Sequence, residues 1–472
     1  MPPRRPREEL ERRGSTNETE PLLQSGRADA NEEVDERELL EFEENDPENP
    51  RNWSRTRKML NVATIASMAI LSPLASSMFT PGIDQIAEGL NTTTNLVIGR
   101  PMYLIGFGVF TLLQIPSGLA PNIATLITMR TISGFFGSVS IANGGGSLSD
   151  MFEPGERAGI FGWYLLGPLM GPTLGPLFGG LIVQRLGWRW IFLILTIVCA
   201  LNTTSAFFFL KETYAPVILA KRKARLEHEQ NKPGKYRFEG EDYRPLYIKL
   251  RYSLTRPLRI LIQPIVMTMS VYQAILFATT YSLYTNFQPI YHGEYGFNTE
   301  QVGLMYLGPG LGFLACVWFI FPRIDTVYNR LASQNNGKGR PEFRLPLANI
   351  GSVFIPVSLF WFAWSVENHT PWIVSIIASF FYGIGQIIIL NSTTNYYIDC
   401  FERYAASAIA AGAVFRAVVG GIIPLFAPML FENLGYGWGI SVFGFLALAI
   451  APAPLIFFIY GAKVRERYWV DV

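Results

Sequence analysis

Two arginines are the most chemically distinctive residues of this sequence, because both lie inside long apolar runs. Arg130 is the only charged residue between Pro101 and Ser149, and Arg416 follows 12 uncharged residues that begin at Tyr404. A charge in such a position is costly and usually binds a partner or a substrate. Arg130 could instead extend its side chain to the membrane surface, and Arg416 could bind a carbonyl or an acid of the protein. The sequence leaves both pairs of interpretations open.

Two apolar runs also carry uncharged polar and aromatic side chains at helical spacing. Between residues 260 and 288 these are Gln273, Thr280, Tyr281 and Tyr284, and between residues 371 and 398 they are Tyr382, Gln386 and Thr393. A surface that mixes amide, hydroxyl and aromatic groups suits a small amphipathic substrate of variable structure. The same groups could equally form hydrogen bonds between helices. Together with Arg130, they are our candidates for the wall of a substrate cavity.

A third pattern is the segment GPLMGPTLGPLFGG, in which every fourth residue is a glycine. The pattern consists of Gly167, Gly171, Gly175 and Gly179, accompanied by Pro168, Pro172, Pro176 and Gly180. Residues four apart share one face of a helix, and small residues on a face let two membrane helices approach closely. Prolines remove hydrogen bonds from a helix and loosen it. The segment therefore predicts a closely packed helix, a hinge, or both.

No arrangement of residues predicts catalysis or metal binding. The three cysteines and three histidines are too few and too scattered for a disulfide framework or a metal site, and no Ser/His/Asp arrangement suggests hydrolysis. Gly144-Gly145-Gly146 is not followed by the Lys-Ser/Thr pair of a phosphate-binding loop. We therefore expect a protein that is not an enzyme, with no metal, no cofactor and no nucleic-acid partner.

The composition indicates what holds these residues in place. Of the 472 residues, 49% are hydrophobic and only 16% are charged, against about 25% charged in a typical soluble protein. Several charge-free runs exceed the ~20 residues that a helix needs to cross a membrane. We therefore predict an all-α, polytopic membrane protein. The expected spans are 59–80, 102–120, 123–149, 158–183, 189–210, 260–288, 302–321, 345–365, 371–398, 405–431 and 438–461.

Charges between the spans predict the topology and the domains. The segment 211–259 carries 13 Lys/Arg and 6 Asp/Glu, and loops rich in Lys/Arg stay cytoplasmic. Both termini are then cytoplasmic, and the sequons at Asn91 and Asn368 are candidate glycosylation sites on the outer side. The expected parts are a disordered cytoplasmic tail (1–50), an incomplete N-terminal helical bundle (51–210), a cytoplasmic central loop (211–259), a C-terminal helical bundle (260–462) and a cytoplasmic tail (463–472).

The segment from Arg100 to Asn122 does not fit this topology as one ordinary span. Counting forward from the first span puts Asn91 on the outer side, and counting backward from the central loop puts Asn122 on the outer side as well. A single span must change sides. Pro116 and Pro121 also weaken the second half of this segment as a helix. We therefore expect a bent or broken helix over residues 101–121, beside a vacant groove.

Ten segments spread over most of residues 47–468 form a pattern that resembles a known family. They are ENPRNWSRTRK, LASSMFTPGIDQIAE, LAPNIATLITMRTISGFFGS, GGGSLSDMFEPGERA, GPLMGPTLGPLFGGLI, GWRWIF, LKETYAPVILAKRKARL, YYIDCFERYAASAIAAGAVFR, PLFAPMLFENLGYGW and IYGAKVRER. Together they resemble the fungal multidrug transporters of the major facilitator superfamily, in the drug:proton antiporter group with twelve spans.

The resemblance implies two helical bundles that bind a small amphipathic substrate between them and export it by alternating access, with protons as the coupling ion. It identifies the glycine segment with the antiporter signature, Arg130 with the family's R-x-x-x-G pattern, and Asp150 and Asp399 with gate or cap positions. Arg416 is a further candidate for gating or coupling. We expect a monomer in the lipid bilayer of the plasma membrane, with a vacuolar or endosomal membrane as the alternative.

The chain departs from the family pattern at the segment that breaks the topology. Arg100 to Gly108 resembles the start of the family's second helix, and Val109 to Asn122 resembles the end of its third. The missing piece would be about 30 residues, because it must supply two half-spans of ~10 residues each and a loop. This chain would then have about 11 spans instead of 12. A protein that has lost transport through this deletion is the alternative to an active exporter.

Overall fold

The fold was determined as a computed structural model. It describes residues 38–43, 45–77, 107–137, 147–148, 150–152, 154–211, 213, 215–232, 234–238, 255–401 and 405–467. The chain divides into two compact units. The smaller contains residues 1–41 and 219–241, and the larger contains 42–218 and 242–472.

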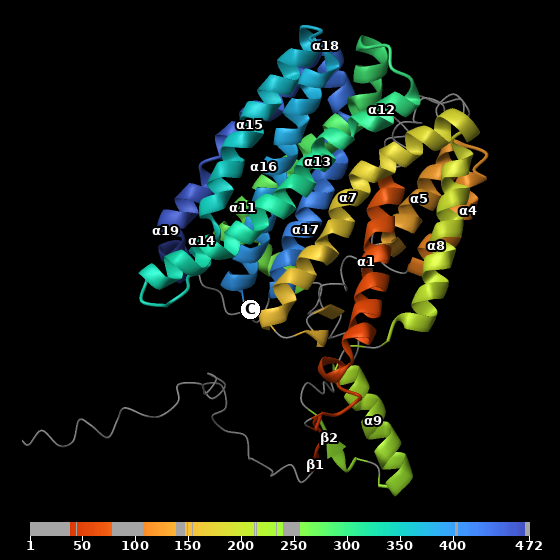
Figure 1. The fold of residues 1–472 in the computed structure, drawn as a ribbon, viewed down its shortest axis with the longest axis vertical. Helices are drawn as coiled ribbons and strands as arrows, with labels where there is room; N and C mark the ends of the chain where they lie inside the picture. The colour runs from red at the N-terminus through yellow and green to blue at the C-terminus, as the bar shows by residue number, and fades with distance from the viewer. Residues whose placement is uncertain are drawn as a thin grey trace, which may run out of the picture. The chain divides into compact units, whose positions relative to one another are not determined.

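The first half of the larger unit is a group of five helices (Figure 1). They are α1 (Arg55–Ser77), α4 (Phe107–Gly118), α5 (Ile123–Gly137), α7 (Pro154–Leu186) and α8 (Arg189–Phe209). Helix α1 packs against α7 and α8, and α4 packs against α5 and α8. Two clusters of buried apolar side chains hold this bundle together, one around Phe110, Trp188 and Phe192 and one around Met151 and Tyr164.

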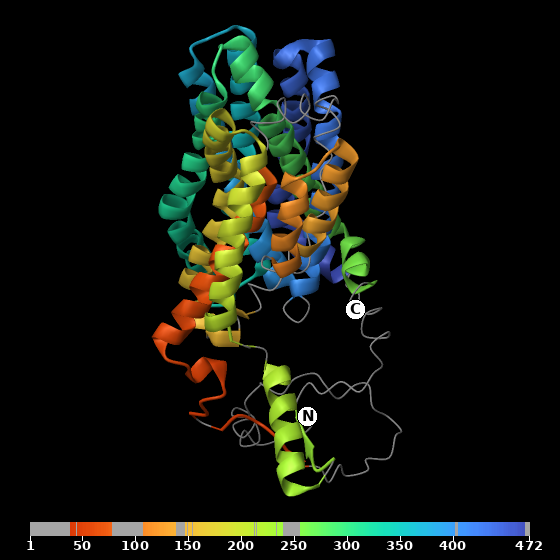
Figure 2. The same ribbon diagram turned by 90° about the vertical axis from the view of Figure 1, so that its right-hand side faces the viewer.

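The second half of the larger unit is a bundle built on long helices that run side by side (Figures 1 and 2). Its elements are α11 (Pro264–Gln288), the π-helix Pro289–Glu294, α12 (Thr299–Met305), α13 (Leu307–Ala315), the π-helix Cys316–Ile320, α14 (Phe321–Gln334), the 3₁₀-helix Pro341–Arg344, α15 (Pro346–Glu367), α16 (Trp372–Cys400), α17 (Ala405–Ile422), the 3₁₀-helix Ile423–Leu425, α18 (Ala427–Ile450) and α19 (Ala453–Arg467). The largest apolar cluster of the described residues lies here, around Tyr272, Phe287 and Phe362.

Each of the eleven predicted spans contains a helix among the described residues. Seven helical segments of the described chain are long and apolar enough to cross a membrane. Helix α4, which is described over 12 residues from Phe107, is not one of them. The predicted all-α, polytopic architecture is confirmed.

The described part of the anomalous segment is a short helix followed by a turn. Helix α4 runs without interruption across the predicted junction at Gly108 and Val109 and ends at Gly118, whereas residues 101–106 lie outside the described part. The Asn122 side chain accepts a hydrogen bond from the backbone N–H of Thr125 at 2.8 Å and so caps the start of α5.

The end of α4 lies beside the start of α8. A Cβ atom placed on Gly118 would lie 3.0 Å from the Cβ atom of Phe192 and 3.5 Å from the carbonyl oxygen of Arg189. The turn after α4 is therefore at the same end of the bundle as the turn between α7 and α8. Asn122 thus lies at the same end of the bundle as the connection between α7 and α8, as the charge-based topology requires.

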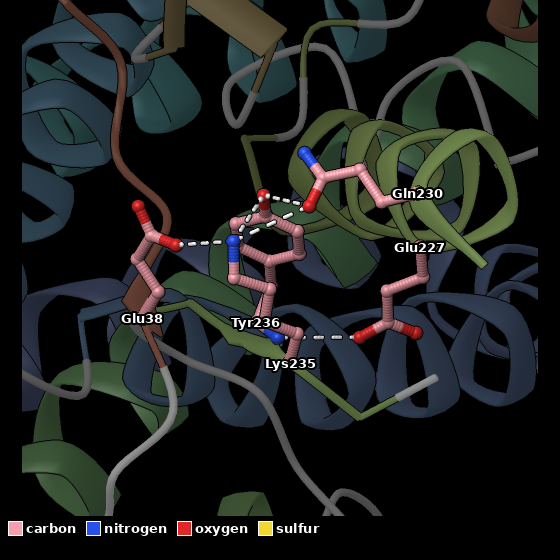
Figure 3. A network of polar contacts seen from close by, with 5 residues as sticks. All are labelled: Glu38, Glu227, Gln230, Lys235 and Tyr236. Atoms are coloured by element: carbon pink, nitrogen blue, oxygen red, sulfur yellow. Dashed lines mark hydrogen bonds and ion pairs between the residues drawn. The ribbon is translucent and has the colours of Figure 1, made fainter. Parts of the chain in front are cut away.

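The smaller unit contains the helix α9 (Ala215–Gln230, of which residues from 219 onward belong to it) and two short parallel strands, β1 (Glu38–Leu39) and β2 (Tyr236–Arg237). Figure 3 shows the polar contacts that join them. The Lys235 ammonium lies 3.0 Å from the Glu38 carboxylate and 3.2 Å from the Gln230 carbonyl oxygen. The Tyr236 hydroxyl donates to the same Gln230 oxygen, and the Tyr236 backbone N–H donates to Glu227. The hydrogen bond that the Lys235 ammonium donates to the Glu38 carboxylate raises the pKa of Lys235.

The tail expected at residues 1–50 lies only partly in the described chain. Residues 1–37 are outside it, β1 lies in the smaller unit, and the turn after β1 lies in the larger unit. Asp46 accepts a hydrogen bond from the Glu48 backbone, and Asn49 caps a 3₁₀-helix at Pro50–Asn52. The backbone of Glu38 and Leu40 pairs with the β2 segment. The charged residues of this tail gave no indication of that pairing in the sequence.

A left-handed glycine produces the sharp reversal between the last two predicted spans. Gly435 has φ 73° and ψ 170° within α18, a region of backbone space that is essentially restricted to glycine. Its neighbour Gly437 donates its backbone N–H to the Glu367 carboxylate at 2.9 Å, which ties the reversal to the end of α15. The break predicted between residues 431 and 438 lies at this position.

We predict that Gly435→Ala destabilises the protein by about 1–3 kcal/mol, because a side chain cannot adopt this backbone conformation without strain. The matched control is Gly421→Ala in α17, where nothing lies within 4 Å of an added Cβ atom and alanine is the better helix former. Cys199, Cys316 and Cys400 are buried, so a thiol-reactive dye reports unfolding of the purified protein. A lower apparent melting temperature for Gly435→Ala only is expected. Equal melting temperatures for the two variants would contradict the prediction.

Candidate functional site

A small hollow in the C-terminal bundle brings together two of the predicted cavity residues. It lies between α11 and α16 and is lined by Gln273, Leu276, Phe277, Gln386 and Leu390. The two glutamine side chains are nearly inaccessible, with Gln273 2% and Gln386 7% exposed. Each has one buried amide atom without a hydrogen-bond partner, the nitrogen of Gln273 and the oxygen of Gln386. Buried polar atoms are normally hydrogen-bonded, so these two are available to a ligand.

Arg416 reaches this hollow from the third helix around it, α17. One of its guanidinium nitrogens donates to the Gln273 carbonyl oxygen at 3.0 Å, which orients the Gln273 amide because a guanidinium can only donate. The guanidinium carbon lies 4.7 Å from the centre of the Phe277 ring, within the range of a cation–π contact. The polar end of the hollow is therefore positively charged.

The remaining predicted cavity residues are used by the protein itself or lie in its packed core. The Thr280 hydroxyl is 2.9 Å from the Tyr382 hydroxyl, and both donate to the Leu276 carbonyl oxygen, so this pair joins α11 to α16. Thr393 donates to the carbonyl oxygen of Ile389 within its own helix. The rings of Tyr284 and Tyr281 pack on aromatic neighbours, with Tyr306 5.2 Å from Tyr284 and Phe277 5.5 Å from Tyr281.

Arg130 is buried in the N-terminal bundle and takes part in a network that the sequence did not predict. It donates to the amide oxygen of Gln114 on α4 at 3.3 Å, and the Gln114 nitrogen donates to Ser133 at 2.8 Å. Its guanidinium also lies 5.6 Å from the centre of the Phe192 ring on α8. Arg130 therefore joins α4, α5 and α8. The one available signal for Gln114 was a side-chain amide in a helix that has no charged residue.

The glycine segment places α7 against both bundles. A Cβ atom on Gly167 would lie 3.0 Å from the carbonyl oxygen of Ala66 on α1, and one on Gly180 would lie 2.6 Å from the carbonyl oxygen of Thr299 on α12. Only glycine allows the backbones to come this close. The other glycines of the pattern are buried as well: Gly171, Gly175 and Gly179. The prolines Pro168, Pro172 and Pro176 lie inside the continuous helix.

We call the contact of α7 with α12 and α13 the seam, formed by Thr173, Pro176 and Gly180 on one side and Thr299, Gly303 and Gly310 on the other. A Cβ atom on Gly303 would lie 2.8 Å from the carbonyl oxygen of Pro176, and one on Gly310 would collide with the Thr173 side chain. Beyond it, Arg185 of α7 forms an ion pair with Glu300 of α12 at 3.2 Å. In the charge-based topology, the seam lies in the outer half of the protein.

The model of the Major Facilitator Superfamily matches residues 59–424 of this chain. The chain belongs to the major facilitator superfamily. An MFS-type transporter of Penicillium rubens, penM, is 36% identical, and the alignment covers 92% of this chain and 91% of that protein. The efflux pump radE of Floropilus chiversii is 34% identical over 89% of this chain and 84% of its own. The MFS-type efflux pump MFS2 of Trichophyton rubrum is 35% identical over 91% and 76%.

A solved structure has the same fold. It is a bacterial homolog of the human lysosomal transporter Spinster in an inward-facing and unoccupied conformation, and it matches with a TM-score of 0.53 at 12% identity, over 89% of this chain and 100% of that chain. The major facilitator fold of the chain is thereby confirmed, and so is its place among multi-pass membrane transporters, which are not enzymes.

Like the seam, the opposite end of this major facilitator chain carries ion pairs. Arg344 pairs with Asp399 at 2.8 Å, and Arg465 of α19 lies 3.3 Å from Glu342. The Glu342 side chain is only 4% exposed, and its position in a loop between two spans gave no signal of burial. Asp150, the other predicted gate residue, accepts a hydrogen bond from Thr213 at 3.2 Å.

Two further groups of predictions concern glycosylation and metals. Asn91 lies outside the described residues. Asn368 is exposed at the end of α15, where its amide donates to the Trp364 carbonyl oxygen at 2.8 Å. Within the described part of the chain, no group of three or more His, Cys, Asp or Glu side chains could hold a metal ion.

We predict that Glu342→Gln destabilises the protein more than Glu300→Gln, although both replace a carboxylate by an amide. Loss of a charge from the buried pair leaves Arg465 without its counterion and costs about 1–3 kcal/mol, whereas the Arg185–Glu300 pair is exposed (69% and 31%) and such pairs contribute about 0–1 kcal/mol. Apparent melting temperatures of the purified variants measure the difference. A larger effect of Glu300→Gln would refute this ranking.

Proposed function

We propose that this chain is a secondary transporter that exports small amphipathic compounds by alternating access, driven by proton antiport. The seam is the observation that carries the proposal. Two bundles that meet through glycine backbones at this seam can separate there and close again with little rearrangement of side chains. The polar hollow beside Arg416 offers a site within one bundle, and two relatives bear the name efflux pump.

The arrangement of the seam supports an inward-facing state. The contacts that join α7 to α12 and α13, together with the Arg185–Glu300 pair beyond them, fall in the outer half of the charge-based topology. Closure on that side is the state in which a substrate would enter from the cytoplasm. Export then requires the seam to open. The two helices would separate at the glycines, where their backbones are in contact.

Proton coupling needs a group that can take up and release a proton. Transporters normally use a carboxylate within the membrane for this purpose, yet the spans of this chain have no acid at their centre. The candidates are therefore Asp150, Asp399 and Glu342, which all lie at the end of the bundles opposite the seam. Of these, Glu342 is the most buried.

A second candidate function is that of a membrane protein that no longer transports. The two parts of the segment from Arg100 to Asn122 resemble different helices of the family. The alignment with the Penicillium rubens protein spans 464 positions while covering 92% of the 472 residues here, which fits a deletion at Gly108–Val109. The nucleotide sequence around these two codons would reveal an in-frame segment that encodes the missing helices.

The first test is the retention of two fluorescent amphipathic dyes, one anionic and one cationic, in cells that lack their own exporters. Expression of this chain is expected to lower the retention of at least one dye several-fold, and collapse of the proton gradient with a protonophore is expected to abolish the effect. A fluorescent tag shows whether the chain reaches the plasma membrane or the vacuolar or endosomal membrane. Unchanged retention with correct delivery would reject export and favour the protein that no longer transports.

The second test addresses alternating access. In Arg185→Cys/Glu300→Cys, a short bifunctional methanethiosulfonate reagent should join α7 to α12 across the seam, because the native side chains lie 3.2 Å apart. We expect the cross-link to stop export and a reductant to restore it, since the seam can then open again. Each single cysteine variant, treated in the same way, is the control. Undiminished export by the cross-linked protein would rule out opening at this seam.

A further inference from the structure

The guanidinium of Arg416 lies within a membrane span without a counterion. None of the described acids forms an ion pair with it; its hydrogen-bond acceptor is the neutral amide of Gln273, and the Phe277 ring lies beside it. The uncharged phenols of Tyr397 and Tyr281 are further polar neighbours. A neutral amide and an aromatic ring attract a cation but leave its charge uncompensated. Charges inside a membrane bundle are normally paired. The site therefore has one unit of positive charge that no acid of the described residues neutralises.

The hollow next to this charge has further groups that lack partners. The Gln273 nitrogen is a donor beside the guanidinium, and the Gln386 oxygen is an acceptor on the facing helix, and both are buried and unbonded. Leu276, Phe277 and Leu390 form the rest of the lining. The site therefore combines a cation and an amide donor with one acceptor and an apolar wall.

We propose that Arg416, Gln273 and Gln386 form a binding site for the anionic group of an amphipathic substrate, such as the carboxylate or phenolate of an aromatic or alkyl acid. This inference rests on the proposed export function and names its substrate class. The anion accepts hydrogen bonds from the Arg416 guanidinium and the Gln273 amide, a neighbouring hydroxyl of the substrate donates to Gln386, and the apolar body lies against Phe277 and the two leucines.

The hollow is narrow in the described structure. Its empty volume of about 180 Å³ includes the open space at its mouth, so binding requires the surrounding helices to part and admit the charged group. The rest of the substrate then extends between the helices. A cationic substrate is disfavoured at the same place, because Arg416 would repel it.

The alternative role of Arg416 is a structural bond between α17 and α11. The 3.0 Å hydrogen bond to Gln273 serves this role in the described structure. A bond of that kind does not require a charge, however, and an isosteric pair of uncharged side chains would make it without the desolvation of a guanidinium. The unbonded amide atoms of both glutamines also have no part in it.

The test measures binding to the full-length protein, purified in detergent, with two xanthene dyes of similar shape and opposite charge. Fluorescence anisotropy at neutral pH gives the affinity for fluorescein, an anion, and for rhodamine 123, a cation. We expect fluorescein to bind more tightly, and Arg416→Gln to weaken its binding by tenfold or more while leaving rhodamine 123 no weaker. Arg330→Gln is the matched control, because it removes the same charge from an exposed position on α14.

Two more variants keep the test decisive if Arg416→Gln is poorly folded. Arg416→Lys retains the charge without the planar fork and should bind fluorescein with intermediate affinity. Gln386→Leu removes an unbonded acceptor, so we expect an unchanged melting temperature and a smaller loss of fluorescein affinity than in Arg416→Gln. The thiol-dye melting temperature establishes that each variant is folded.

The outcomes separate this inference from the proposed function. Fluorescein affinity that depends on Arg416, in a protein that lowers the retention of no dye in cells, would support the site and reject export. Export together with wild-type fluorescein affinity in the folded Arg416 variants would reject the site and leave export standing. A protein that binds fluorescein no better than rhodamine 123 would also overturn the inference, whether or not it transports.

Discussion

The close approach of α7 to its neighbours is the constraint on which both bundles depend. Along one helix, Gly167 lets the backbone of α1 come near, and Gly180 does the same for α12. In lipid, apolar side chains gain little by meeting one another, so helices associate through close packing of small residues. A methyl group at either position would push the helices apart. Helix α7 therefore joins the parts of the N-terminal bundle and also provides that bundle's side of the seam.

Three buried charged side chains lie in the bundles around α7, and their partners are as follows. Arg130 is held by a neutral amide from α4 and by an aromatic ring from α8, and it joins three helices. Glu342 is paired with Arg465 at the end of the C-terminal bundle opposite the seam. Arg416 is bonded to a neutral amide beside a hollow with unsatisfied groups. Arg130 and Arg416 thus have the same kinds of partner, a neutral amide and an aromatic ring, but of the two only Arg416 lies beside the hollow with unbonded amide atoms.

The sequence predicted the arrangement of the spans well and the individual contacts poorly. Charge-free runs and basic loops predicted a helix in all eleven ranges and a break between residues 431 and 438, because hydrophobic length and charge act locally. Burial of Glu342 and the pairing of Gln114 with Arg130 depend on which helices meet, and no local pattern encodes that. The polar faces of α11 and α16 were correctly seen as unusual. Whether a hydroxyl or amide there already has a hydrogen-bond partner depends on small differences in the distance between helices. The Thr280 and Tyr382 hydroxyls are bonded to each other, whereas the amide oxygen of Gln386 has no partner.

The place of α4 in the topology has a consequence for how the chain enters its membrane during synthesis. Both ends of the segment from Arg100 to Asn122 are expected on the outer side, so the ribosome-bound chain cannot rely on this segment to set its orientation. The arginines and lysines of the central segment emerge later and favour retention on the cytoplasmic side. Orientation of the preceding helices is then decided after they have been made, and it depends on α5 and α8 capturing α4 through Gln114 and Gly118. Biogenesis of this chain is thus exposed to competition between correct assembly and removal by the machinery that degrades misinserted membrane proteins.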